Sequence, residues 1–218
     1  MEAPVRFIDA TLEPLLSGAN HSFEAGSVSE IVTRGEDECA FFVKACTGIA
    51  RLQGGKIIVL GKELGTLSRD ALGGIRSRMG VVHPGGGLIS NLKVFENVTL
   101  PLLYHSAGSG PEIGERAAAS LRRFGWKGDL FDLPGRLSTF QRRVVGFARA
   151  IAMDPDVVVY DRLVDGLHGE ERDLFLRTAF AFHKEKPGRV TICVTSRAGS
   201  ISGDAPAAVV HLTKGRFE

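Results

Sequence analysis

The stretch VTRGEDECAFFVKACTG, residues 32–48, combines a short apolar strand, a polar turn and an amphipathic helix. This layout binds phosphate when glycines in the turn expose backbone N–H groups and a lysine adds positive charge. In this chain the turn carries Glu36, Asp37 and Glu38 instead. Two like charges about 4 Å apart repel by about 4 kcal/mol at an effective dielectric of about 20, so these acids oppose phosphate binding.

The acidic turn has two interpretations. Its carboxylates would either hold a divalent metal ion or form an acidic loop that is solvated or internally paired. No further metal ligands are evident around the turn, so the second interpretation is favoured and no metal is expected. A second group of interest is Asp161, which ends the apolar run VVVYD and is followed by Arg162.

Apolar runs bounded by glycine and proline predict the elements that position these residues. Strands are expected at 28–32, 56–60, 79–82, 157–160 and 190–195, with a terminal hairpin at 207–215. Helices are expected at 40–47, 117–124 and 169–186, and after Ser138, where STFQ matches a capping box. Residues 105–116 are expected to form a surface loop, and Pro101 to interrupt a helix that starts near Asn91.

Strands that alternate with helices predict an α/β fold with an open, mostly parallel sheet. The helical middle of the chain interrupts this alternation. One domain is therefore expected, with an α/β core at 1–84 and 154–218 and a helical subdomain at 85–153.

The composition is that of an ordinary soluble globular chain, with 218 residues, 44% of them hydrophobic, and a net charge of +2. This small charge, without a dense basic block, argues against a nucleic-acid partner. Cys39, Cys46 and Cys193 are widely spaced, which favours reduced thiols over a disulfide framework or a zinc site. The N-terminal residues do not resemble a signal peptide, and no apolar run is long enough to span a membrane.

Four stretches in this order resemble the nucleotide-binding (ATPase) subunit of ABC transporters, which has a P-loop NTPase-like core. They are the strand–turn–helix at 28–48, MGVVHPGGGLISNLKVFENVTLPL at 79–102, LPGRLSTFQRRVVGFARAIAMDPDVVVYD at 133–161, and DGLHGEE at 165–171. The segment GGGLISNLKVFENVTLPL is further similar to the ATPases of Mce/Mla-type lipid importers. The resemblance implies that two subunits dimerise head to tail, bind two ATP molecules between them and drive a membrane permease.

The resemblance places the family's phosphate-binding loop, Walker A, on the acidic turn. Its glycine positions then fall on Thr33, Glu36 and Glu38, and its lysine and its Mg²⁺-binding hydroxyl fall on Cys39 and Ala40. Gly35 also lies in this loop. The groups that would hold a nucleotide are therefore absent, and the loop is expected to be degenerate.

Other family positions are also altered. The signature loop, LSGGQ in the family, corresponds to Leu137 followed by Ser138, Thr139, Phe140 and Gln141, where the Phe140 ring would hinder a partner's phosphate. Walker B retains Asp161, but Arg162 stands where the family has its catalytic glutamate. The Q-loop glutamine falls on Pro84, the D-loop aspartate on His168 and the switch histidine on Ser196, so no catalytic residue is expected.

These substitutions together predict a pseudo-ATPase: a non-enzymatic ABC-type scaffold or regulatory subunit of a membrane transporter, with lipids as candidate cargo. It would use no cofactor. Its partners would be an integral-membrane permease and either an intact ABC ATPase subunit or a second copy of the chain. The permease would hold it, as a cytoplasmic protein, on the inner face of the membrane.

Two alternatives remain open at this stage. One is an ABC transporter ATPase that retains weak binding or hydrolysis of ATP with Mg²⁺, and the other is a soluble regulator that has left transport. If the family's fold holds, Arg162 should lie close to the acidic turn. We therefore expect its guanidinium to pair with Glu36, Asp37 or Glu38 in place of a nucleotide.

Overall fold

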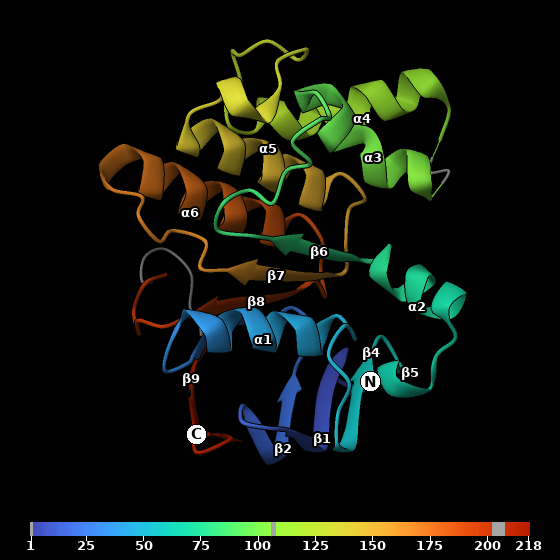
Figure 1. Cartoon of the computed structure of the whole chain (residues 1–218), viewed down its shortest axis with the longest axis vertical. Helices are drawn as coiled ribbons and strands as arrows, with labels where there is room; N and C mark the ends of the chain where they lie inside the picture. The colour runs from blue at the N-terminus through green and yellow to red at the C-terminus, as the bar shows by residue number, and fades with distance from the viewer. Residues whose placement is uncertain (1, 106–107, 202–207) are drawn as a thin grey trace.

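The computed structural model describes residues 2–105, 108–201 and 208–218, and Figure 1 shows their arrangement. The strands are β1 (Val5–Leu12), β2 (Leu16–Phe23), β3 (Val28–Val32), β4 (Gly54–Val59), β5 (Lys62–Glu63), β6 (Met79–Val82), β7 (Val157–Asp161), β8 (Val190–Thr195), β9 (Ala208–Thr213) and β10 (Arg216–Phe217). The α-helices are α1 (Glu36–Cys46), α2 (Arg69–Arg76), α3 (Val94–Tyr104), α4 (Gly110–Arg122), α5 (Thr139–Ile151) and α6 (Gly169–Lys184). Two short 3-10 helices, η1 (Leu64–Thr66) and η2 (Pro134–Arg136), complete the described elements.

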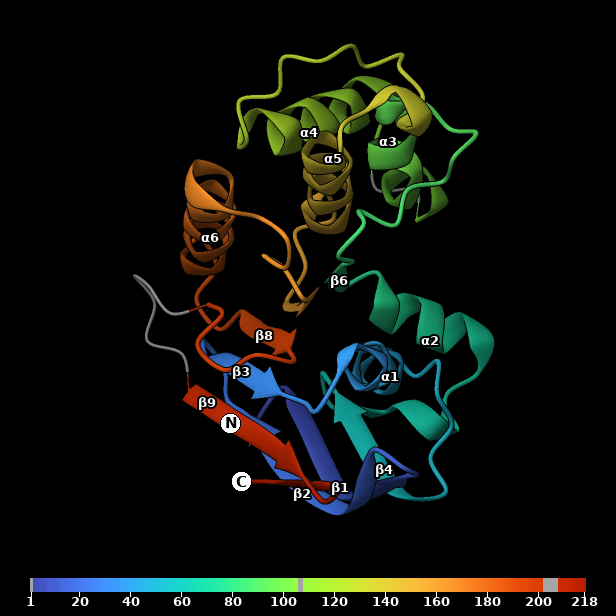
Figure 2. The ribbon, with the colours of Figure 1, turned by 60° about the vertical axis from the view of Figure 1, so that its left-hand side comes forward.

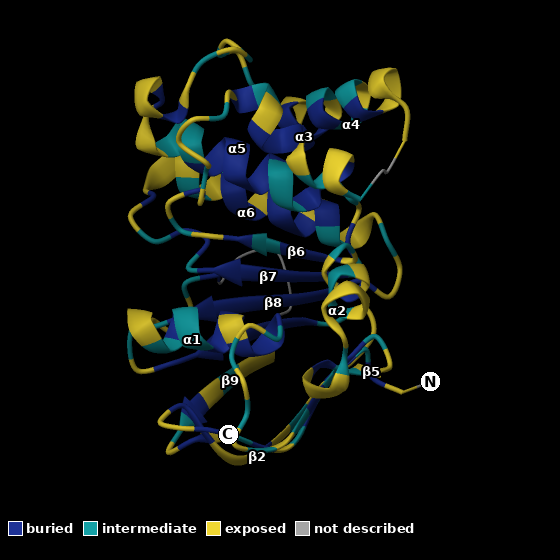
Figure 3. Ribbon diagram, turned by 45° about the vertical axis from the view of Figure 1, so that its right-hand side comes forward, coloured by how far each residue is buried: buried dark blue, intermediate teal, exposed yellow. Residues whose placement is uncertain are grey.

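The larger sheet confirms the predicted mostly parallel α/β core. Its strand order is β10-β9-β3-β8-β7-β6, and the β9–β3, β3–β8, β8–β7 and β7–β6 pairs are all parallel. Strands β3, β7 and β8 are buried along their whole length, as Figure 3 shows for β7 and β8. Continuous apolar runs such as VTICVT are typical of parallel strands with both faces covered.

Two hydrophobic clusters cover the two faces of this sheet. One contains buried side chains of α3, α4, α5 and α6, including Val98, Leu121, Phe147 and Phe175. The other surrounds α1, which lies between the parallel sheet and the smaller β2-β1-β4-β5 sheet (Figure 2). Helix α1 is therefore held on two sides by packed apolar surface.

The small antiparallel sheet contains two strands that the sequence did not predict, β1 and β2. They pair with each other, and β1 also pairs with β4. Both pairings of β1 contain register shifts, and β2 carries Gly18, Asn20 and His21 in place of an apolar run. Such strands show only a weak alternating pattern, because they are stabilised by the neighbouring strand and by burial of one face.

Two predictions about the helical middle are wrong. Helix α4 starts at Gly110 instead of near 117, so part of the predicted surface loop is helical. Ser109 and Glu112 form a capping box there, and Pro111 stands in the first turn, where its missing N–H costs little. Helix α3 continues through Pro101, because burial of Val98 and Leu102 offsets one lost backbone hydrogen bond.

Helices α3, α4 and α5 lie together beyond the β6 side of the parallel sheet (Figure 1). All three fall within residues 85–153. The division of the chain into an α/β core and a helical subdomain stays a prediction. The described helices include none that is both long and apolar enough to cross a membrane.

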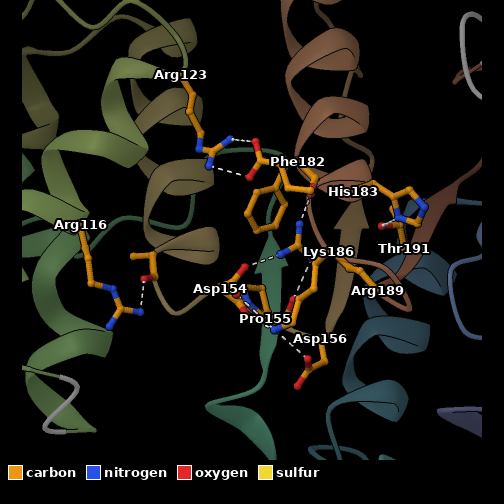
Figure 4. Close-up of polar contacts among 12 residues, drawn as sticks. Arg116, Arg123, Asp154, Pro155, Asp156, Phe182, His183, Lys186, Arg189 and Thr191 are labelled. Carbon is orange, nitrogen blue, oxygen red and sulfur yellow. Dashed lines mark hydrogen bonds and ion pairs between the residues drawn. The ribbon is translucent and has the colours of Figure 1, made fainter.

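A polar cluster lies at the amino ends of β7 and β8, around the buried Arg189 (Figure 4). Its Nε donates to the carbonyl oxygen of Pro155 at 2.9 Å, its other nitrogens bond the Phe182 carbonyl and the Asp154 carboxylate, and its guanidinium lies 3.6 Å from the centroid of the Phe182 ring. Arg123, the C-cap residue of α4, forms a two-pronged ion pair with Glu185, which follows α6. This cluster joins the end of α6, the α5–β7 turn and α4.

The three cysteines, Cys39, Cys46 and Cys193, are free thiols in the interior. Burial raises the pKa of each thiol above its ordinary value. They lie on α1 and β8 and contribute to the packing around the parallel sheet.

Candidate functional site

The candidate site lies at the carboxyl edge of the parallel sheet. Val32 of β3 pairs with Thr195 of β8, and Val194 pairs with Asp161 of β7, so these strands end side by side. The turns that follow them converge, and this edge is where open α/β sheets bind ligands. The sequence-predicted groups after β3 and after β7 are thus brought together.

Helix α1 begins at Glu36, four residues earlier than predicted. Glu36, Asp37 and Glu38 form its first turn and do not lie in a loop. Acidic side chains are stabilising at this position because the helix dipole places partial positive charge at the amino terminus. Gly35 is the extended N-cap residue, with φ −167°, and its carbonyl oxygen accepts the first helical bond from Cys39 N at 3.1 Å.

The residues at the expected first glycine and lysine positions contact each other inside the protein. The Thr33 hydroxyl lies 3.1 Å from the Cys39 sulfur and donates to the Gly35 carbonyl oxygen at 3.0 Å. Thr33 and Cys39 are both buried, while Ala40 is half-buried. Cys39 therefore faces the core and offers no group to a ligand at this edge.

Arg162 pairs with the acidic turn, which confirms the prediction made from the family resemblance and from opposite charge. Its Nη1 forms an ion pair with the Glu36 carboxylate, and its Nε lies 3.3 Å from Asp161 Oδ1. Its backbone N–H donates to the Val194 carbonyl oxygen at 2.8 Å, and its φ is +49°. Burial lowers the pKa of Arg162, but the hydrogen bond with Glu36 and the charge of Asp161 outweigh it, and the pKa is raised.

A second ion pair neutralises Glu38. Arg34 Nε donates to Glu38 Oε1 at 2.9 Å, and the Arg34 backbone N–H donates to Glu38 Oε2 at 3.0 Å. Among the described residues, Asp37 is the one acid of the turn without an ion pair. The sequence reasoning missed the Arg34–Glu38 pair, although its i, i+4 spacing was a usable signal.

A cleft of about 620 Å³ opens beside Asp161, lined among others by His83, Pro84 and Arg142. His83 Nδ1 lies 3.9 Å from Asp161 Oδ2, and Asp161 itself is 3% exposed. Arg149 of α5 donates to the carbonyl oxygen of Gly87 at 2.8 Å, which holds this wall of the cleft in place. Pro84, at the expected Q-loop position, contributes to the wall and offers no side-chain donor.

The signature-like residues lie apart from the acidic turn, at the start of α5. Ser138 is the N-cap residue and accepts from Gln141 N at 3.1 Å, while Gln141 Oε1 accepts from Ser138 N at 2.9 Å. Thr139 is exposed and lies within 3.3 Å of Arg142 Nη2. The Phe140 ring packs edge-on against Phe175, with centroids 5.6 Å apart, so it turns toward the core.

The residues at the expected switch and D-loop positions lie just after β8 and at the start of α6. Ser196 follows β8 and is half-buried, and His168 is the N-cap residue of α6 without a side-chain capping bond. In the described parts of the chain, no ion pair joins either residue to the Arg162–Glu36 pair. Among the described residues no group of three His, Cys, Asp or Glu side chains is placed to hold a metal ion.

A parallel sheet, a strand–turn–helix at its carboxyl edge and a second strand, one place removed from the first, that ends in an acid define the class of P-loop nucleotide-binding folds. Solved ABC cassettes have this fold. A dimeric ATP-binding cassette, MJ0796, bound to ADP and Pi, matches with a TM-score of 0.86 and 22% identity over 98% of this chain and 96% of its own. CbiO1 from Clostridium perfringens, part of an ABC transporter complex, matches with a TM-score of 0.82 and 20% identity over 100% of this chain and 88% of its own.

The sequence relatives identify the family. The cell division ATP-binding protein FtsE of Haemophilus influenzae is 30% identical over 159 residues, which cover 72% of this chain and 72% of FtsE. The chain belongs to the family of ABC transporter ATP-binding proteins. No family model matches it.

Longer relatives match over part of their length. The probable ribonucleotide transport ATP-binding protein mkl of Mycobacterium tuberculosis is 30% identical over 66% of this chain and 40% of its own. The methionine import ATP-binding protein MetN of Caulobacter vibrioides is 28% identical over 79% of this chain and 52% of its own. The chain thus spans about half or less of these transport relatives.

These relatives contradict the predictions of a pseudoenzyme and of a chain without a cofactor, because all of them are named ATP-binding proteins. The two predictions are wrong. They rested on the altered family positions and on the negative charges of Glu36, Asp37 and Glu38, which oppose a phosphate. In the structure two of the three are neutralised, by Arg162 and by Arg34, so the electrostatic penalty on an anion is smaller than predicted.

The β3–α1 turn offers few groups that a bound phosphate chain would need. In the described arrangement the Arg162 guanidinium is covered by the Glu36 carboxylate, and the lysine position is the buried Cys39. This arrangement does not fit a nucleotide phosphate. The side chains described at the β3–α1 turn therefore do not suit the ATP that proteins of this family bind.

Proposed function

We propose that the chain is an ATP-binding subunit of an ABC transporter, which docks on a membrane permease. Its relatives named for transport support this function, as does the cassette fold. Docking on a permease would hold the chain against the inner face of a membrane.

The observation that carries the proposal is an apolar cleft of about 510 Å³ between α3 and the β6 edge of the sheet. Its lining includes Met79, Pro101 and Met153, and three of its large hydrophobic side chains are unusually exposed. Ile49 is 65% exposed, Leu100 36% and Tyr104 78%. Exposed apolar surface gathered around a cleft is typical of a site for another protein.

The apolar lining of this cleft and its two arginines suit one turn of an amphipathic helix from a permease. Apolar side chains of such a helix would pack on Met79, Met153 and Leu100. Arg76 and Arg149 also line the cleft, so an acidic side chain on the helix would be favoured.

We further propose that the chain works as part of a dimer, either with a second copy or with another ABC ATPase subunit. The MJ0796 cassettes, which share this fold, were solved as dimers. The cargo is a separate question. Lipid transport rests on the similarity of residues 85–102 to lipid importers, whereas the relatives above are named for ribonucleotide and methionine transport.

The proposal is tested by expressing the chain with its permease and measuring co-purification and ATP binding. Tyr104→Glu should reduce co-purification at least about tenfold, because it places a charge in an apolar interface. Val209→Glu is the matched control, since Val209 is 49% exposed on β9, far along the sheet from α3. It should leave co-purification unchanged.

Two results would contradict the proposal. Failure of the wild-type chain to co-purify with any permease would favour a soluble regulator. Absence of ATP binding to the purified complex, with and without Mg²⁺, would contradict the nucleotide-binding part.

A further inference from the structure

We propose that a cavity at the carboxyl end of α1 binds a small amphiphilic carboxylate, a molecule with one negative charge and a short apolar tail. The cavity has a volume of about 600 Å³ and lies where the end of α1, the β4–β5 hairpin and α2 meet (Figure 1). Small-molecule sites have volumes of about 300–1,000 Å³. Such a site is additional to the ATP and permease sites proposed above, and it lies at the other end of α1 from the acidic turn.

Apolar side chains form the floor of the cavity. Ala50, Leu52, Leu67 and Leu72 all line it, and each is partly buried against the hydrophobic cluster around α1. Their remaining accessible surface faces a hollow, and an apolar tail that covers it removes it from water. The tail of a ligand would therefore bind on these side chains.

Contacts at the end of α1 hold the walls of the cavity in place. Gly48 has φ +66°, and a Cβ added to it would lie 3.2 Å from Leu72 Cδ1, so α2 packs closely on the end of this helix. The N–H groups of Ile49 and Ala50 both donate to the Lys44 carbonyl oxygen, at 2.8 and 3.0 Å. The cavity is therefore preformed, which reduces the cost of ordering the protein on binding.

Two cationic side chains line the cavity without a partner. Arg51 is exposed just beyond the end of α1, and Lys56 is half-buried on β4. Among the described residues, no ion pair or hydrogen bond involves either side chain. Of the described residues that line the cavity, Glu63 is the only acid, so two positive charges and one negative charge leave a net charge of +1.

This set of charges favours a single carboxylate over other head groups. A guanidinium and an ammonium group both donate charge-assisted hydrogen bonds to carboxylate oxygens. One negative charge also matches the net charge of the lining. A cationic head group would be repelled by two positive charges, and a neutral head group would leave both of them unpaired.

The experiment titrates the purified full chain with octanoate and follows the methyl groups of labelled leucine by NMR. We expect saturable shifts of the methyl signals of Leu52, Leu67 and Leu72, because these side chains line the cavity. The methyl signals of Leu133 should not shift, since Leu133 is 43% exposed in the helical middle of the chain and does not line the cavity.

Three further probes separate the tail from the head group. Acetate lacks the tail and should bind about tenfold more weakly than octanoate or less tightly still, because it leaves the apolar floor uncovered. Octanol lacks the charge and octylammonium reverses it. Each should bind at least about threefold more weakly than octanoate, which is the effect of losing exposed charge pairs.

Substitutions of the charged lining residues should change affinity in opposite directions. Arg51→Gln and Lys56→Gln should each weaken octanoate binding about threefold, and Glu63→Gln should tighten it about twofold. Lys62→Gln is the matched control, because Lys62 is exposed on β5 in the same hairpin and does not line the cavity. It should leave the affinity unchanged, and thermal unfolding checks that each variant is folded.

Several results would overturn this site. Octanol that binds as tightly as octanoate, or equal losses for Arg51→Gln and Lys62→Gln, would show that the two cations hold no carboxylate. The absence of a saturable shift, or shifts confined to methyl groups outside the cavity, would show that octanoate does not bind there. ATP binding and co-purification with a permease are measured without octanoate, so the proposed function stands or fails independently.

Discussion

At the scale of single residues, the site depends on where Arg162 is anchored. A positive φ of +49° is unusual for a residue other than glycine, and a bond to β8 maintains it. This conformation directs the guanidinium back across the sheet edge toward α1. A lysine at this position would have a single point charge, and it could not contact Asp161 and Glu36 with a rigid fork.

Asp156, at the opposite edge of the sheet, is expected to make the free energy of unfolding depend on pH in the acid range. Burial raises its pKa, but hydrogen bonds from Lys186 and Arg78 outweigh it, so the pKa lies below the ordinary value. The ion pairs measure 2.8 Å and 2.6 Å. A lowered pKa stabilises the fold above about pH 4, and this contribution is lost as pH falls through the lower folded pKa.

Asp156→Asn should therefore lower Tm at pH 7, and the difference from wild type should shrink as pH falls below about 4. Asp70→Asn, on the exposed first turn of α2, is the control and should show a smaller difference at pH 7. A constant gap between wild type and Asp156→Asn from pH 7 to 3 would contradict the assignment.

At the scale of elements, the loop after β6 is fixed by close approach to α5. A Cβ on Gly146 would lie 2.2 Å from the Gly86 carbonyl oxygen, which is closer than any side chain allows. Gly86 itself has φ +81°. The wall of the cleft beside Asp161 thus requires glycine on both sides of this contact.

Gly146→Ala should destabilise the fold by about 1–3 kcal/mol, the usual cost of overpacking. Gly74→Ala on α2 is the matched control, because nothing lies within 4 Å of its added Cβ. It should stabilise the chain by about 0.5–1 kcal/mol, since alanine is the better helix former. Urea unfolding of both variants measures the difference, and equal effects would contradict the close contact.

Much of the parallel sheet could be predicted, because β3, β6 and β8 are apolar runs with clear limits and their predicted bounds are those observed. The Arg162–Glu36 pair was predictable from opposite charges, because the family resemblance placed both residues at one sheet edge. The start of α4 was not, because Gly108 and Gly110 favour a loop and the Ser109–Glu112 cap was overlooked. The pairing of the acids in this turn was underestimated, because the Arg34–Glu38 contact was missed. This contact forms because α1 starts at Glu36, before its predicted start.

At the scale of the whole molecule, Arg189 links two segments that are distant in sequence, the α5–β7 turn and the end of α6. Its guanidinium bonds the α5–β7 turn and the end of α6, just before β8 begins (Figure 4). Burial lowers the pKa of Arg189, and the charge of Asp154 opposes this effect. Without the arginine, the carbonyl oxygen of Pro155 would lose this donor, and the carbonyl oxygen of Phe182 would keep the Glu185 N–H, at 3.3 Å, as its donor.

Arg189→Ala should cost about 3 kcal/mol in unfolding free energy, from the lost hydrogen bonds to the Pro155 and Phe182 carbonyl oxygens and from a cavity. Arg189→Met should cost less, because its aliphatic chain can still pack on Phe182. Arg177→Ala is the control on the exposed face of α6 and should change stability by about 0.5 kcal/mol or less. Similar losses for Arg189→Ala and Arg177→Ala in chemical denaturation would contradict this role.

The three buried thiols can be used to measure how often the structure around them opens. Cys39, Cys46 and Cys193 are 0%, 1% and 2% exposed, so a thiol reagent reaches them when the structure around α1 and β8 opens. Under conditions where reagent reacts faster than the protein recloses, the modification rate equals the opening rate. Mass spectrometry after timed labelling would then give the lifetime of the closed sheet edge without any added fluorophore, and a ligand that binds at this edge should lengthen it.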